Sequence, residues 1–547
     1  MPRLQRRRPT AWVVTALAAL ILTGCGGAAQ PSPGAPGVAG ARAAPGSTEA
    51  PELKLAIGGE EQDGFDPTLG WGRYGSPLFQ SPLLTRTADL SIGFDLATDY
   101  VVSDDALVWT VQLRDDAHFT DGEPVTAEDV AFTFNTAAEQ GGLTDVTALD
   151  EAIATGDHTV ELRLRQPQST FVNRLISLGI VPAHAHGEGY GAEPIGSGPY
   201  ELVSWQRGQQ LVVQRNDDYY GDLPEFERLV FVFSEEDATL AAARAGELHL
   251  AGVPAAMATQ DLPGMRLEPV TAIDNRGISL PTVPDAGSLS ADGNPVGNDV
   301  TADPAIREAL SYAVDREALV DGILEGFGAP AVGPVDGTPW HEPDVVVGDA
   351  DPDRAAQILE QAGWVDSDGD GTREKDGVPA EFTLLYPGTD SLRQGLAVAV
   401  ADMAAGVGLT VRAEGASWED IYVRLNQDAV LFGGGSHDPM EMYNLYHSAQ
   451  AGIGFGNTAF YANPVVDAHL DAALAATDQD TAEAAWRAAQ LDSDGNGFST
   501  DYPWVWLVNL DHTYFVDECL DLGDLQIEPH GHGWPITAGI SSWRWTC

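Results

Sequence analysis

Three short segments carry side chains that could bind a small molecule, and the longest is residues 433–447, GGGSHDPMEMYNLYH. Its three glycines would let the backbone approach a ligand closely, because glycine has no Cβ, and loops often carry binding residues. Asp438 has a second interpretation, since it could cap a helix that begins at Pro439. The candidate ligand-binding side chains of this loop are His437, Asp438, Glu441 and Tyr443.

The second segment is residues 70–75, GWGRYG, where glycines separate Trp71, Arg73 and Tyr74. Aromatic rings and a guanidinium at this spacing suit the wall of a cleft, and an arginine there could hold a carboxylate. The alternative is a packed turn whose aromatic side chains belong to the core.

The third segment is residues 529–534, PHGHGW, which contains His530 and His532 and ends at Trp534. Closely spaced histidines are potential nickel or zinc ligands, and Trp534 is a further candidate for ligand contact. Half of the 12 histidines lie after residue 430, so a metal site drawing on this segment and on the glycine loop is conceivable. A structural role for the histidines is the alternative.

Two acidic loops begin like calcium-binding loops but lack the residue that would complete one. Residues 366–371 read DSDGDG and residues 492–497 read DSDGNG. Position twelve of such a loop is normally glutamate, and here it is Gly377 and Pro503. We therefore expect both loops to be turns, with calcium binding as the weaker alternative.

Motifs typical of enzymes are missing from the sequence. It contains no His-Glu-x-x-His, no Gly-x-Ser-x-Gly and no Gly-x4-Gly-Lys phosphate loop. An exported metal-dependent hydrolase is therefore a disfavoured alternative. We expect no enzymatic activity and no cofactor.

The charge balance also limits the possible partners. The chain has 547 residues, with 28 Lys and Arg against 82 Asp and Glu, and a formal net charge of −54. Such a surface repels phosphate backbones, so we expect no nucleic-acid binding. It would suit cationic ligands, but an adaptation for solubility is the simpler explanation.

The N-terminus predicts export. Four arginines precede a largely apolar stretch at residues 11–22, which is shorter than the ~20 residues of a membrane-spanning helix and fits a secretory signal. The stretch ends in Leu-Thr-Gly-Cys25, which resembles the lipobox of bacterial lipoproteins. That resemblance implies cleavage before Cys25 and attachment of acyl chains to this residue, including a fatty acid such as palmitate, and so a lipid anchor in the cell membrane. An ordinary signal peptide is the alternative.

Residues 25–51 are rich in Gly, Ala, Pro and Ser, so we expect a flexible tether there. The two remaining cysteines, Cys519 and Cys547, could form a disulfide in an oxidising compartment or stay as free thiols.

The folded part predicts a mixture of strands and helices. Alternating apolar residues or short apolar runs predict strands at 53–57, 107–114, 160–164, 211–215, 229–233, 409–413 and 430–432. Capping residues and apolar periodicity predict helices from 126 and at 236–246, 303–324, 351–363, 391–407, 418–426 and 464–477. This mixture favours an α/β fold in two lobes.

Several segments resemble the extracytoplasmic solute-binding proteins, family 5, of peptide, dipeptide and nickel importers. The opening Phe65-Asp66-Pro67 is similar to the family's first motif. The other matching segments are residues 101–134, 195–220 with Gly-Ser-Gly-Pro-Tyr, 303–328, 351–377 and 429–447. The resemblance covers nearly all of the chain after about residue 52.

The resemblance implies a two-lobed periplasmic-binding-protein-like fold of the large type, with an inserted domain and a ligand cleft between the lobes. After the signal peptide at 1–24, the tether at 25–51 leads to the folded part. The first lobe would comprise 52–90, 191–300 and the C-terminal return 506–547. The inserted subdomain would be 91–190, and the second lobe 301–505.

The implied function is that of a monomeric, extracytoplasmic substrate-binding lipoprotein of an ABC importer, in the periplasm or on the outer face of the cytoplasmic membrane. It would capture a peptide or peptide-like ligand and deliver it, by hinge closure, to the permease and its ATPase subunits. The alternative within this family is nickel or a metal chelate. In peptide-binding members an aspartate in this loop binds the peptide amine, so Asp438 or Glu441 could do so here, although the sequence departs from the usual Asp-Tyr pattern before the proline.

Overall fold

The structure is a computed structural model that describes residues 52–61, 64–74, 78–531 and 534–547. The predicted signal segment, Cys25, the predicted tether and His532 lie outside the described residues. None of the helices in these ranges is both long enough and apolar enough to cross a membrane.

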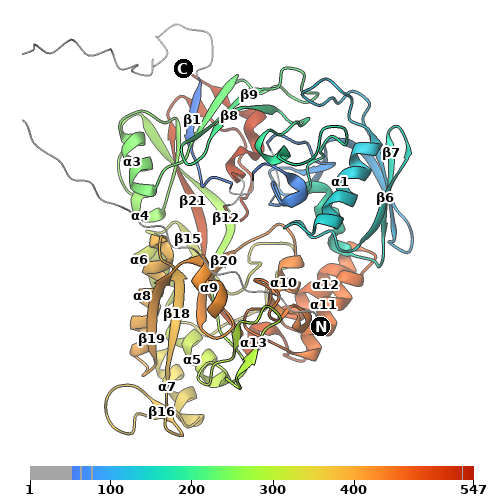
Figure 1. Ribbon diagram of the computed structural model, residues 1–547. Coiled ribbons are helices and arrows are strands. Elements are labelled where there is room, and N and C mark those ends of the chain that lie inside the picture. The colour runs from blue at the N-terminus through green and yellow to red at the C-terminus, as the bar shows by residue number, and fades with distance from the viewer. Residues whose placement is uncertain (1–51, 62–63, 75–77, 532–533) are drawn as a thin grey trace, which may run out of the picture. The chain divides into compact units, whose positions relative to one another are not determined.

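The largest feature of the fold is a mixed sheet of 11 strands (Figure 1). Parallel pairs flank β1 and β18, whereas the strands between these two groups pair antiparallel. In spatial order its strands are β19 (Thr410–Ala416), β18 (Glu381–Pro387), β20 (Ala429–Gly434), β12 (Met265–Ser279), β21 (Trp504–Asp517), β11 (Leu250–Val253), β1 (Leu53–Ala56), β10 (Arg228–Val232), β9 (Gln210–Arg215) and β8 (Tyr200–Gln206), and β15 (Gly328–Pro330) pairs with β21.

The two longest strands, β12 and β21, lie side by side between the two groups of parallel strands and so join the two halves of the sheet. They have 15 and 14 residues and pair antiparallel along most of their length. Their register shifts between Thr271 and Asn275. Such an irregularity bends a strand and frees its side chains from the regular alternation, and a polar cluster occupies this point of the fold.

A separate antiparallel sheet follows β1 in the chain. Its order is β4 (Ala97–Val102), β5 (Val108–Leu113), β7 (Thr159–Leu164) and β6 (Leu149–Gly156), and α1 (Ala127–Gln140) packs on β6 and β7. The predicted start of this helix is confirmed, because Thr126 and Asp129 form a capping box. Apolar residues from both layers, among them Val111, Phe134 and Leu162, form one fully buried core.

One predicted helix, 303–324, is wrong as a single element. The structure divides it into α5 (Pro304–Ala313) and α6 (Arg316–Ile323). Val314 is extended, and the Asp315 carboxylate accepts a hydrogen bond from the Ala318 amide at 2.9 Å, which caps the second helix. The break lets the Arg316 side chain enter the interior, where it donates to the carbonyls of Trp506 and Gly348 at 2.8 Å each.

The remaining elements are short strand pairs and helices, of which β16 lies at the lower tip of the molecule in Figure 1. The pairs are β2 (Leu84–Arg86) with β3 (Ile92–Phe94), β13 (Ser288–Leu289) with β14 (Pro295–Val296), β16 (Glu374–Lys375) with β17 (Val378–Pro379), and β22 (Leu520–Asp521) with β23 (Arg544–Trp545). The helices are α2 (Val172–Ser177), α3 (Glu236–Arg244), α4 (Ala255–Ala258), α7 (Pro352–Gln361), α8 (Ser391–Ala405), α9 (Trp418–Arg424), α10 (Met440–Tyr446), α11 (Pro464–Ala475), α12 (Gln479–Gln490) and α13 (Phe498–Asp501).

The C-terminus is fastened by a disulfide. Cys519 and Cys547, which the sequence left either paired or free, are bonded, with their Cα atoms 5.3 Å apart. Cys519 directly precedes β22 and Cys547 follows β23, so the disulfide joins the outer ends of this strand pair and holds the C-terminus there.

Candidate functional site

A cavity of about 160 Å³ lies where five parts of the chain meet. Its walls come from residues 73–74 and 78–95, from α2, from Pro199 and Tyr219, from the loop 436–438 that follows β20, and from Gln526 and residues 537–541 near the C-terminus. We call it the arginine cavity, because Arg73, Arg86 and Arg174 line it. Arg73, Tyr74, His437 and Asp438, which the sequence analysis selected, also line this cavity.

Asp438 makes two interactions in the cavity wall. Its carboxylate forms an ion pair with Arg174 of α2, and both side chains are buried. It also accepts a hydrogen bond from the Met440 amide at 3.0 Å, next to the start of α10, whose N-cap residue is Pro439 and not Asp438. Burial raises the pKa of Asp438 even though the positive charge of Arg174 opposes this. Its negative charge is therefore already balanced by a residue of this chain.

Arg86 crosses from β2 to the same loop. Its guanidinium donates to the His437 carbonyl at 2.8 Å and to the Asn173 side-chain oxygen at 2.5 Å. Burial, helped by the charge of Arg86, lowers the pKa of His437 to about 3. His437 is therefore neutral at physiological pH and adds no positive charge to the cavity.

Arg73 and Tyr74 form the wall nearest the start of the chain. The Arg73 guanidinium carbon lies 4.8 Å from the centre of the Tyr74 ring, which is cation–π distance. Burial raises the pKa of Tyr74, so its hydroxyl stays protonated and can donate a hydrogen bond.

Trp71 and Trp534 pack in the core of the first part of the sheet. Trp71 is 4% exposed and Trp534 is 2% exposed. Their rings meet edge to face at 5.4 Å, and Trp534 stacks on Phe231 at 4.3 Å. Neither residue lines the arginine cavity. Both tryptophans therefore lie in the core beside the cavity.

Glu441 and Tyr443 also lie outside the lining of this cavity. The Glu441 carboxylate accepts hydrogen bonds from the amides of Gly435 and Ser436, at 2.9 Å each, and burial raises its pKa to about 7. Tyr443 stacks on His447 with ring centres 4.3 Å apart. Glu441 therefore holds the backbone of the loop through these two amides, and Tyr443 packs on His447.

The glycines of this loop are required by packing. A Cβ at Gly433 would lie 2.5 Å from the Arg276 guanidinium, and one at Gly435 would lie 2.2 Å from the Ile273 carbonyl oxygen. Gly435 also has a φ of +129°, which other residues rarely adopt. The glycines let the loop approach β12, where the sequence analysis expected them to approach a ligand.

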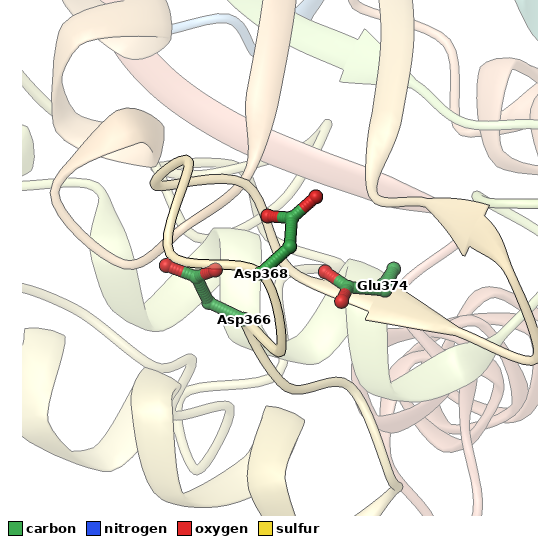
Figure 2. Close-up of side chains that lie close together, drawn as sticks. All are labelled: Asp366, Asp368 and Glu374. Carbon is green, nitrogen blue, oxygen red and sulfur yellow. The ribbon is translucent and has the colours of Figure 1, made fainter.

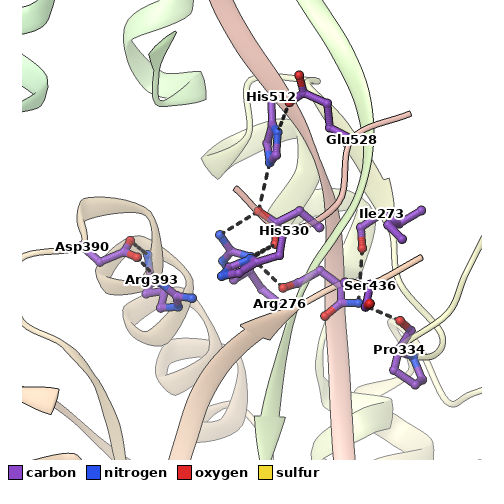
Figure 3. A network of polar contacts seen from close by, with 12 residues as sticks. Ile273, Arg276, Pro334, Asp390, Arg393, Ser436, His512, Glu528 and His530 are labelled. Atoms are coloured by element: carbon purple, nitrogen blue, oxygen red, sulfur yellow. Dashed lines mark hydrogen bonds and ion pairs between the residues drawn. The ribbon is translucent and has the colours of Figure 1, made fainter. Parts of the chain in front are cut away.

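His530 belongs to a buried polar cluster around Asp274, which we call the Asp274 network (Figure 3). Asp274 forms an ion pair with Arg276, and its carboxylate oxygens lie 2.6 Å from Nδ1 of His530 and 3.1 Å from Nε2 of His512. Nδ1 of His512 lies 2.5 Å from Glu528. His530 therefore contacts a carboxylate of the protein itself, that of Asp274.

The charges in this network are matched. Burial disfavours an ionised Asp274, but the charge of Arg276 prevails and holds the pKa of Asp274 well below its usual range. Burial likewise disfavours a charged His512, but its contacts with Asp274 and Glu528 raise its pKa to about 9. The network lies where the register of β12 and β21 shifts, so it fixes the irregular point of the two connecting strands.

The described residues contain one group of acidic or histidine side chains close enough to share a metal ion. It consists of Asp366, Asp368 and Glu374, whose oxygens lie within 4.8 Å of one another (Figure 2). Glu374 was not selected from the sequence, because it stands at position nine of the loop. Asp366 accepts the amides of Gly369 and Gly371, so these carboxylates also fold the turn that the sequence predicted.

Two cavity residues, Arg86 and Arg174, had no signal in the sequence. Each stands in a segment with ordinary helix or strand patterning, and only the tertiary fold brings them to the loop at 436–438. The large charge imbalance of the chain gave no hint that arginines would gather in a cavity.

Comparison with known proteins identifies the family. The model of "Bacterial extracellular solute-binding proteins, family 5 Middle" matches residues 92–454. The chain is 37% identical over 500 residues to Protein XP55 of Streptomyces lividans, covering 88% of each chain. It is 30% identical over 406 residues to the probable D,D-dipeptide-binding periplasmic protein DdpA of Escherichia coli, covering 70% of this chain and 74% of that protein.

Solved structures agree on the fold. NikZ of Campylobacter jejuni in complex with Ni(L-His) superposes with a TM-score of 0.79 at 22% identity, covering 90% of this chain and 99% of that one. The fold is therefore the two-lobed α/β fold of periplasmic binding proteins. With the family model spanning most of the folded part, the chain belongs to the bacterial extracellular solute-binding proteins of family 5.

Proposed function

We propose that this chain captures a peptide or peptide-like solute outside the cytoplasmic membrane and delivers it to the permease of an ATP-driven importer, without performing chemistry on it. The observation that carries the proposal is the composition of the arginine cavity. Its walls combine residues of the predicted first lobe and inserted subdomain with the loop that follows β20 of the predicted second lobe.

Two contacts join these walls directly. Arg86 donates to the His437 carbonyl, and Arg174 pairs with Asp438. A solute in this cavity touches both sides at once, so it favours the closed arrangement by its differential affinity for that state. The closed, ligand-bound form is then the one that docks productively on the permease.

The anchoring follows from the N-terminal segment. We propose that residues 1–24 are removed, that Cys25 carries the lipid anchor, and that residues 25–51 tether a monomeric folded part divided as the resemblance implies. A Cys25→Ser variant should appear in the medium or the soluble extracellular fraction, while the unchanged protein stays with the membrane. Equal membrane retention of both would contradict the lipid anchor.

A metal chelate is the second candidate, because the NikZ structure contains Ni(L-His). In this chain the described histidine of the predicted pair, His530, is engaged by Asp274. We therefore favour a chelate whose carboxylates contact the protein over a metal bound directly by His530.

Thermal unfolding of the mature protein with a panel of compounds tests the proposal. The panel contains dipeptides of each charge, a pentapeptide, the small carboxylates citrate and glutamate, and a nickel–histidine complex. A ligand at 100 times its Kd stabilises by about 2.7 kcal/mol, so a true ligand raises Tm measurably. We expect at least one small peptide-like compound to do so. A panel in which no compound shifts Tm would contradict the proposal.

A further inference from the structure

The charge of the arginine cavity is opposite to that of the chain. The chain has 82 acidic residues against 28 basic ones. The cavity nevertheless contains three guanidiniums, from Arg73, Arg86 and Arg174, against the two carboxylates of Asp95 and Asp438. More than a tenth of the basic residues of the chain therefore meet around about 160 Å³.

Neither carboxylate makes an ion pair with Arg73 or Arg86, although the charge of Asp438 also acts on Arg86 from beyond contact distance. Asp438 is the ion-pair partner of Arg174. Asp95 accepts a hydrogen bond from the Tyr220 hydroxyl, and its burial raises its pKa to about 6. Among the described residues, no carboxylate lies within ion-pair distance of Arg73 or Arg86.

Arg86 keeps donors for a ligand. A guanidinium has five N–H groups, and Arg86 donates three hydrogen bonds, all to neutral oxygens, those of Leu90, Asn173 and His437. These bonds fix its position at the cavity wall and leave two N–H groups. Arg73 contacts the face of Tyr74. A partly buried charge without a counter-ion is unfavourable, and a carboxylate suits a guanidinium in both charge and geometry.

We propose that the arginine cavity selects a small ligand with at least two carboxylates, such as an acidic dipeptide or a dicarboxylate, bound by Arg73 and Arg86. This inference rests on the proposed function and narrows its ligand. It also differs from the cationic ligand that the acidic composition would suit, an idea for which the sequence analysis gave solubility as the simpler explanation. The volume limits the ligand's length, because cavities for drug-sized molecules measure about 300–1,000 Å³.

Calorimetric titration of the mature protein at constant ionic strength tests the charge selection. The probes are Glu-Glu, its neutral isostere Gln-Gln, and Lys-Lys, with citrate as a second carboxylate. We expect Glu-Glu to bind at least tenfold more tightly than Gln-Gln, and Lys-Lys not to bind. One charge-assisted contact corresponds to a roughly ten- to hundredfold change in affinity.

The variant Arg73→Gln should remove the preference for Glu-Glu over Gln-Gln. Arg412→Gln is the matched control, because Arg412 is an exposed arginine of β19 outside the cavity, and it should keep the preference. Arg86→Lys retains the charge but not the fork of donors, so it should bind Glu-Glu more weakly. Equal unfolding temperatures of the free proteins would show that the variants are folded.

Three results would overturn the inference: Gln-Gln or Lys-Lys binding as tightly as Glu-Glu, an unchanged preference in Arg73→Gln, or no binding of Glu-Glu and citrate. If a neutral or basic compound of the thermal panel binds instead, the role as a solute-binding protein stands and only the charge selection fails. If no compound of any charge binds, the proposed function fails with it.

Discussion

The arginine cavity and the Asp274 network contain the same residue types but differ in how far their charged groups are paired. Each joins aspartate, arginine and histidine from distant parts of the chain. In the Asp274 network every ionic group shown in Figure 3 has a partner of opposite charge. In the arginine cavity the direct contacts of Arg73 and Arg86 that the structure describes are with neutral groups, and neither arginine has an ion-pair contact. A cluster in which each charged side chain has a partner of opposite charge stabilises the fold. A cluster with arginines that lack an ion-pair partner can bind an anionic ligand.

The largest loss of stability should come from removing a charged residue of the Asp274 network. Asp274→Ala leaves Arg276 and His512 buried without their shared counter-ion. Removing one member of a buried ion pair costs about 3–5 kcal/mol, and we expect the free energy of unfolding to fall by that amount in urea denaturation. The isosteric Asp274→Asn should recover part of it by keeping hydrogen bonds. A loss below about 1 kcal/mol in Asp274→Ala would contradict the structural role.

The two sites should lose stability at opposite ends of the pH range. The pKa of His512 is raised to about 9, so the protonated form stabilises the fold fully below about pH 6.5, and this contribution is lost as pH rises through 9. The shift corresponds to roughly 2–4 kcal/mol. His512→Gln should lower stability at pH 6 and flatten the alkaline decline. Parallel curves for variant and unchanged protein between pH 6 and 10 would be inconsistent with this.

His437 gives the converse behaviour. Its pKa is lowered to about 3, so the neutral form is favoured in the folded state, and its contribution is lost as pH falls from about 6.5 toward 3. His437→Asn should reduce the acid-side decline in Tm and leave the alkaline side unchanged. An effect confined to alkaline pH would contradict the assignment.

Replacing Asp438 should reduce stability less than replacing Asp274, but it should also change the affinity for the ligand. Asp438→Ala should cost about 1–3 kcal/mol, because Arg174 loses its ion-pair partner but lines a cavity and is not enclosed on all sides. The freed guanidinium should also tighten binding of Glu-Glu, whereas Asp274→Ala should leave that affinity unchanged in folded protein. Weaker binding of Glu-Glu by Asp438→Ala, measured by calorimetry, would separate this residue from the charge balance of the cavity.

Local sequence patterns predicted the elements whose causes are local. The helix start at Thr126 follows from its capping box, and the strand at 107–114 follows from its alternation. The long strand β12 was missed, because it contains Pro269, Gly277 and a run of polar residues, 274–276, whose partners include groups from distant parts of the chain. The break near Asp315 was missed as well, since its reason is the burial of Arg316 elsewhere in the fold.

The candidate site was predictable in part. Arg73, Tyr74, His437 and Asp438 stand in loops with glycine and proline, and they do line one cavity. Trp71, Trp534 and His530 have the same sequence setting but are used by the core and the Asp274 network. What separates the two groups is the partner that each side chain finds across the fold, and spacing along the chain carries no information about that partner.

Native mass spectrometry of the mature protein, purified without denaturation, tests the central claim most directly. We predict a population carrying one small non-covalent molecule of acidic character, which is released on unfolding and is lost in Arg73→Gln but retained in Arg412→Gln. A bound molecule that remains in Arg73→Gln with unchanged occupancy, or one that carries a net positive charge, would contradict the account.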